Sequence, residues 1–154
     1  MEYLVRTARI TDIDRLVALS GTAPRGDRVD SPMDAGDLLR QLVYLPQASI
    51  FVAEVRRELV GGALLGLRPS VRAGGYVGTV DFLVVDPDHD ADQVAPVLID
   101  ELVRSASNKG CTLVEVAPEG PAERTRWEQQ GFAESGPRME RAVVAVGATA
   151  RRAR

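Results

Sequence analysis

Residues 80–116 read VDFLVVDPDHDADQVAPVLIDELVRSASNKGCTLVEV and contain three changes of pattern within 37 positions. An apolar run ends at Val85, and aspartates then stand at every second position from 86 to 92. Apolar residues recur at helical spacing over 94–108, glycine follows at the helix end, and a second apolar run covers 111–116. This stretch therefore predicts a strand, an acidic loop, a helix and a further strand.

The flanking sequence predicts the remaining elements of one mixed sheet. Upstream we expect a first strand at 3–8 and helices that start at Thr11 and Ser31. Three further strands are expected at 49–55, 59–67 and 76–85. Downstream we expect a helix over 121–130 and a final strand over 139–146. The order is βααβββαβαβ, which predicts an α/β domain whose mostly antiparallel sheet has helices on both faces.

Composition predicts one ordinary globular domain. The 154 residues are 45% hydrophobic and 27% charged, with a net charge of -3, so nothing favours nucleic acid or acidic membranes as partners. We expect a single domain over 1–146 and a basic, disordered tail over 147–154. One cysteine and one histidine exclude a disulfide framework and a Cys/His zinc site. Without a signal peptide or membrane span, the expected location is the cytoplasm.

Four phrases of the chain, in this order and spacing, suggest a family. They are RTARITDIDRLVALS at the start, FVAEVRRELVGGALL in the hairpin, residues 80–116, and RWEQQGF near the end. Together they resemble the GNAT superfamily of acyl-CoA-dependent N-acyltransferases over about residues 4–145. The resemblance implies a GNAT-like fold and acetyl-CoA or another acyl-CoA as co-substrate.

The resemblance also implies where acyl-CoA would lie. The backbone of Leu83, Val84 and Val85 would pair with the pantetheine arm. The loop that follows this strand in the family is rich in glycine, carries a basic or amide residue, and wraps the pyrophosphate. In this chain the loop falls on Asp90, Ala91, Asp92, Gln93, Val94 and Ala95. The glycines and the basic residue are missing and the aspartates oppose an anion, so we expect CoA to bind weakly or not at all.

The catalytic positions implied by the resemblance are only partly kept. Asp81 stands where many relatives place a glutamate that removes a proton from the amine, so it is the candidate general base. Trp127 stands where many relatives have a tyrosine that protonates the leaving thiolate. An indole N–H is not a useful proton source, and we expect Trp127 to pack rather than to act in catalysis.

The aspartates have a second interpretation as oxygen ligands for calcium or magnesium. Asp86, Asp88 and Asp90 have suitable alternating spacing, and Asp92 extends it. An EF-hand is excluded, because its glycine and glutamate positions hold other residues in either register. We expect no tightly bound metal; an acidic surface loop that binds nothing remains the third interpretation.

Three functions follow from these observations. The first is transfer of an acetyl or other acyl group from acyl-CoA to a primary amine on a small molecule or a protein. The second is a non-catalytic GNAT-like module that has lost CoA and binds a protein or metabolite, with a homodimer as a candidate assembly. The third is a cation-dependent variant that uses the aspartate loop.

Overall fold

The computed structural model describes residues 2–21 and 34–144. Within these ranges no helix is long and apolar enough to cross a membrane. The elements, in chain order, are β1 (Leu4–Thr7), the 3-10 helix η1 (Ile10–Asp12), α1 (Ile13–Ser20), α2 (Ala35–Leu42), β2 (Ala48–Val55), β3 (Glu58–Ser70), β4 (Gly75–Val85), α3 (Ala91–Asn108), β5 (Cys111–Glu115) and α4 (Pro121–Gln129).

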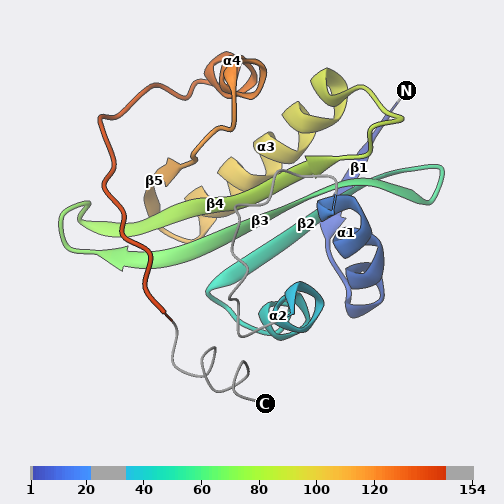
Figure 1. The fold of residues 1–154 in the computed structure, drawn as a ribbon, viewed down its shortest axis with the longest axis horizontal. Coiled ribbons are helices and arrows are strands. Elements are labelled where there is room, and N and C mark those ends of the chain that lie inside the picture. Colours follow the sequence, from blue (N-terminus) through green and yellow to red (C-terminus); the bar gives the residue numbers. More distant parts are fainter. Residues whose placement is uncertain (1, 22–33, 145–154) are drawn as a thin grey trace.

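The five strands form one sheet in the order β1-β2-β3-β4-β5 (Figure 1). The first four strands pair antiparallel, and β5 runs parallel to β4 after the crossover through α3. A parallel neighbour requires such a crossover, because a short turn can only reverse the chain. The mixed, mostly antiparallel sheet with flanking helices is the fold class predicted from the sequence, and it is confirmed.

Two hydrophobic cores lie on opposite faces of this sheet. Phe51 and Ala53 of β2 belong to the core under α3, whereas Ile50 and Val52 belong to the core under α1 and α2. The division follows from the alternation of side chains along a strand. Leu98 and Leu102 of α3 are fully buried, so the crossover helix anchors the first core.

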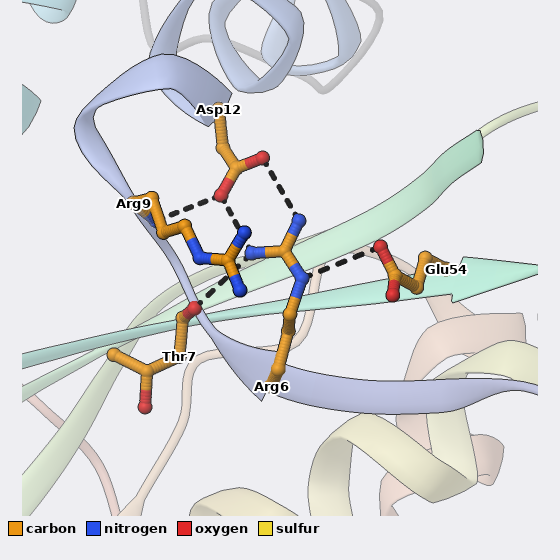
Figure 2. Close-up of polar contacts among 5 residues, drawn as sticks. All are labelled: Arg6, Thr7, Arg9, Asp12 and Glu54. Carbon is orange, nitrogen blue, oxygen red and sulfur yellow. Dashed lines mark hydrogen bonds and ion pairs between the residues drawn. The ribbon is translucent and has the colours of Figure 1, made fainter. Parts of the chain in front are cut away.

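A polar network joins β1, η1 and β2 at one edge of the sheet (Figure 2). Arg6 donates to both carboxylate oxygens of Asp12, at 2.8 and 3.0 Å, and also to Glu54 at 3.3 Å. Asp12 further accepts the backbone N–H of Arg9 at 2.7 Å and so caps the first helical turn. The hydrogen bond from Arg6 lowers the pKa of the Asp12 carboxyl below its ordinary value, although burial opposes the shift.

The β2–β3 hairpin turns without glycine. Arg56 and Arg57 at its tip adopt positive φ angles of 52° and 65°. Two-residue hairpin turns of this hand need positive φ at both positions, which asparagine and glycine adopt more easily. The arginines accept the strained conformation because ladder pairing on both sides, such as Val55 with Glu58, holds the turn closed.

The predicted final strand over 139–146 does not form in its described part. Residues 139–144 lie outside any helix or strand, and Met139, Val143 and Val144 are 96%, 82% and 71% exposed. The segment ends in an apolar run, but a strand also needs a partner for its backbone groups, and none of the described strands pairs with residues 139–144. The order within the described ranges therefore ends at α4. Residues 145 and 146, and the predicted tail over 147–154, lie outside the described residues.

Candidate active site

The candidate site lies where β5 separates from β4. The parallel pairing of the two strands runs only from Tyr76 to Thr79, although β4 continues to Val85. On its other edge β4 stays paired with β3 as far as Val85. Among the described residues, the outer edge of β4 from 80 to 85 therefore has no strand partner, and it forms one wall of a notch.

The strand geometry identifies which backbone groups face this notch. The N–H of Asp86 donates to Val60 of β3 at 2.8 Å. Backbone groups alternate in direction along a strand, so Val84 also faces β3. Leu83 and Val85 face the opposite way, toward the notch, where no described strand pairs with β4, so their N–H and C=O groups can meet an extended ligand.

Asp81 lies at an irregularity in β4. Leu64 of β3 pairs with Phe82 and the next residue, Leu65, pairs with Val80, so Asp81 is the extra residue of a β-bulge. The bulge inverts the side-chain alternation, because Val80 packs under α3 whereas Phe82 packs under α1 and α2. The Asp81 side chain is exposed, and no described residue forms a hydrogen bond or ion pair with it. A carboxylate in this setting is available to a substrate.

A small cavity of about 150 Å³ opens between the end of β4, α3 and α4. Leu83 and Val85 form one wall of it, and Trp127 of α4 another. Trp127 is 2% exposed and packs edge to face on Phe132, with ring centroids 4.8 Å apart. Sites for small molecules usually have volumes of roughly 300–1,000 Å³, so the indole leaves only a narrow space here.

Two of the four aspartates have structural roles that the sequence did not indicate. Asp86 is 7% exposed, accepts the N–H of Asp88 at 2.9 Å, and pairs with Arg15 of α1 at 2.7 Å. Asp90 is the N-cap of α3 and accepts the N–H of Asp92 at 2.9 Å. These bonds fix the loop and join it to α1, so Asp86 and Asp90 have structural roles of their own.

Asp92 forms an ion pair with Arg126, a basic residue of the site that was not predicted from the sequence. Its carboxylate pairs with Nε of Arg126 at 3.3 Å, and Arg126 lines the small cavity beside Trp127. The Arg126 side chain is 21% exposed, whereas Asp92 is 79% exposed. The only signal for Arg126 in the sequence was its place immediately before Trp127 in RWEQQGF. Helix α4 brings Arg126 to the start of α3, next to Asp92, which lies 34 positions earlier in the chain.

The aspartate loop does not gather metal ligands. Within 2–21 and 34–144, no three histidine, cysteine, aspartate or glutamate side chains lie close enough together to hold a metal ion. Asp86 and Asp90 point into their own turns, and Asp92 points to Arg126. The geometry therefore gives no support to the cation-dependent interpretation of Asp86, Asp88 and Asp90.

Comparisons with known proteins agree with this geometry. Residues 13–132 match the model of the acetyltransferase (GNAT) family. No curated protein matches the chain. Since the family model covers most of the chain, the protein belongs to the GNAT acetyltransferase family, whose members use acetyl-CoA.

Solved structures share the fold at low sequence identity. A transcriptional regulator from Bacillus halodurans superposes with a TM-score of 0.80 at 17% identity, over 92% of this chain and 100% of that one. Glucosamine-6-phosphate N-acetyltransferase from Arabidopsis thaliana gives 0.74 at 16% identity, over 92% and 99%. A protein from Clostridium acetobutylicum with acetyl-CoA, predicted to be an acetyltransferase, gives 0.72 at 16%, over 92% and 96%. At these identities the similarity establishes the fold alone.

Proposed function

We propose that this protein transfers an acyl group from acyl-CoA to a primary amine at the notch between β4 and β5. The observation that carries the proposal is the edge of β4 beyond Thr79, which no strand of the described ranges pairs with, beside the bulge at Asp81. An extended pantetheine arm carries amide groups that can pair with such an edge as a further strand would. Leu83 and Val85 supply the pairing groups, while Val84 remains in the ladder with β3.

The diphosphate end of the ligand meets opposing charges. Arg126 supplies a positive charge and the start of α3 a favourable dipole. Against them stand Asp92, which already pairs with Arg126, and Asp90, which already occupies the N–H of Asp92. An incoming phosphate must displace or oppose these carboxylates, so we expect acyl-CoA to bind weakly.

The reaction uses few groups of the protein. Asp81, directly or through a water, removes a proton from the protonated amine, and the free amine attacks the thioester carbonyl. The N–H of Leu83, the residue nearer to Asp81 in the strand, stabilises the oxyanion of the tetrahedral intermediate, while the C=O of Leu83 and the N–H and C=O of Val85 pair with the pantetheine arm. The attacking nitrogen gives its surplus proton to solvent water, and collapse of the intermediate breaks the carbon–sulfur bond, so the products are an amide and CoA thiolate. Trp127 cannot protonate that thiolate, so the thiolate takes its proton from solvent.

A titration of thermal stability with acetyl-CoA tests the binding step. At 100 times the dissociation constant, a ligand specific for the native state raises the free energy of unfolding by about 2.7 kcal/mol. If the melting temperature does not rise at acetyl-CoA concentrations up to about 1 mM, the proposal is contradicted. The binding free energy would then be weaker than roughly 4 kcal/mol. Magnesium and calcium should not change the result; a shift that requires either ion would favour the cation-dependent variant instead.

Variants of two arginines on α4 test the location of the diphosphate. Arg126→Gln should weaken acetyl-CoA binding by roughly tenfold or more, because a charge-assisted hydrogen bond is lost. Arg124→Gln is the matched control: it lies on the same helix but pairs with Glu134 and lies outside the cavity. Acetyl-pantetheine, which lacks the diphosphate, should bind both variants equally. Equal effects of the two substitutions on acetyl-CoA would show that the diphosphate lies elsewhere.

A non-catalytic binding module is the second candidate function. The N-cap bond of Asp90 and the narrow cavity beside Trp127 favour it, because both occupy space or donors that CoA would use. Asp90→Asn separates the two candidates, since asparagine also caps helices but carries no charge. If CoA binds, this variant should bind it more tightly; if no variant binds CoA, the module is the better description.

A further inference from the structure

A second and larger cavity lies at the corner of the sheet formed by β1 and β2. Its volume is about 420 Å³, within the range of small-molecule sites. It is bounded by the start of β2, the end of α2 and the last two turns of α3. It shares no lining residue with the cavity beside Trp127, so it is separate from the proposed acyltransferase site.

The cavity exists because β1 is short. Thr7, the last residue of β1, pairs with Phe51, whereas β2 begins three residues earlier, at Ala48. On the β1 side, residues 48–50 of β2 therefore have no paired strand among the described residues, and only the N–H of Ala8 donates there, to Ile50 at 2.8 Å. Helix α3 continues to Asn108 beside this corner. The overhanging helix and the missing length of strand together leave the space.

The cavity contains the only lysine of the chain. Basic residues otherwise number 18 arginines, and Lys109 follows the last residue of α3. Its Nζ donates to Oγ of Ser49 at 2.7 Å, and no carboxylate of a described residue lies within ion-pair distance of it. Ser49 is 8% exposed, so a buried hydroxyl holds the ammonium at the cavity wall. An ammonium has three N–H donors, and a single hydroxyl uses one of them.

Taken together, the residues that line the cavity carry one net positive charge and form an apolar wall. Arg104 is already paired with Glu101, so these two charges cancel and Lys109 supplies the excess. Leu42, Val43 and Ile50 contribute apolar surface. An anion with a single charge and a short apolar body matches both features, whereas a dianion would be left half neutralised.

We propose that this cavity binds a short aliphatic monocarboxylate. Its carboxylate accepts from Lys109 Nζ and from the Ser49 hydroxyl, which can accept from the lysine and donate to the ligand at once. The aliphatic part of the ligand lies against Leu42 and Val43 at the end of α2. The site is independent of the acyl-CoA notch and does not require the chain to be a working acyltransferase.

Hexanoate is the probe, followed by amide chemical shifts of the isotope-labelled full chain. Shifts should move at Ser49, Lys109 and Gly110 with a dissociation constant of about 1 mM, as expected for so few ligand atoms. Lys109→Gln should weaken binding roughly tenfold or more, and Lys109→Arg should restore most of it. Arg72→Gln, which removes an exposed positive charge outside the cavity, is the matched control and should leave binding unchanged.

Two control ligands distinguish the contribution of the carboxylate charge to binding from that of the aliphatic chain of the ligand. Neutral hexanamide should bind at least tenfold more weakly than hexanoate, and inorganic phosphate should not reproduce the shifts. The proposal is overturned if hexanamide binds as tightly as hexanoate, or if Lys109→Gln and Arg72→Gln behave alike. It is also overturned if hexanoate shifts Leu83 and Val85 instead, or shifts nothing up to about 10 mM.

Discussion

Asp12 shows how a single carboxylate can hold three segments together. It accepts two hydrogen bonds from Arg6 and one from the backbone of Arg9, and through Arg6 it is linked to Glu54 (Figure 2). Its side chain is 12% exposed, so these bonds are largely shielded from water. The hydrogen bond from Arg6 lowers the pKa of Asp12 in the folded protein.

The lowered pKa predicts a pH-dependent stability. In the unfolded chain Asp12 titrates near its ordinary value of 3.8, and in the folded protein it titrates below that. Its contribution to stability is therefore present in full above the unfolded value and is lost as pH falls through the folded pKa. Asp12→Asn should lower the free energy of unfolding by about 1–2 kcal/mol at neutral pH. It should also reduce the loss of stability with falling pH, measured by urea unfolding between about pH 2 and 6 and called here the acid limb.

Asp37→Asn is the control for this experiment. Asp37 pairs with Arg40 at 3.3 Å but is 70% exposed, so its ion pair is screened by water. We expect this variant to keep the acid limb of the wild-type protein. An identical pH dependence in wild type and Asp12→Asn would show that Asp12 does not keep its charge through the Arg6 contact.

At the scale of elements, α1 packs on β3 at a residue without a side chain. A Cβ added to Gly62 would lie 2.2 Å from Cδ2 of Leu16, which is fully buried. Real contacts do not approach so closely, and Leu16 is surrounded by the core under α1 and α2. The close approach of the helix to the sheet thus depends on this glycine.

Gly62→Ala should therefore lower the free energy of unfolding by about 1–3 kcal/mol, because the added methyl overpacks the core. Gly66→Ala is the matched control on the same strand, since its added Cβ would meet nothing closer than 3.9 Å. In a Leu16→Ala background the cost of Gly62→Ala should largely disappear. Equal costs for the two glycine variants in chemical denaturation would mean that α1 does not rest on Gly62.

For the whole molecule, the number of strands in the sheet is itself testable. Val143 is 82% exposed in the structure, although the sequence predicts a strand over 139–146. Val143→Ala should change the free energy of unfolding by less than about 0.5 kcal/mol. The same truncation at Val60, which is fully buried in β3, should cost about 2 kcal/mol. Comparable costs at both positions would mean that residues 139–144 pack as a strand after all.

Much of the fold could be predicted because its signals are local. The strand, acidic loop, helix and strand over 80–116 each follow from spacing within a few residues, and the structure confirms all four. The final strand was wrong because a valine-rich apolar segment indicates only that it suits a sheet, not that the edge of a sheet is available to pair with it. A helix start was predicted at Thr11; the first helical turn begins at Ile10, and its N-cap is Arg9, whose backbone N–H donates to Asp12.

The candidate site could be predicted only in part. Asp81 and the strand end at Val85 were identified from their place in the phrase, but the bulge at Asp81 depends on register with Leu64 and Leu65. Arg126 was missed because it reaches the start of α3 only through the position of α4. The larger cavity with Lys109 and Ser49 was also missed, since 60 positions separate the two residues.

The family followed from the resemblance of four phrases of the chain, and the family model confirms it. The amino-acid order alone was sufficient for the crossover and for the element types as far as α4, because hydrophobic periodicity and helix signals act over a few neighbouring residues. Its aspartates looked like an anion site with the wrong charge. The folded chain assigns them other roles: Asp86 binds Arg15, Asp90 caps α3, and Asp92 pairs with Arg126. The cap at Asp90 is a local contact, but the ion pairs with Arg15 and Arg126, the edge of β4 that no described strand covers and both cavities arise from contacts between distant segments. Such contacts exist only once the sheet and helices have packed.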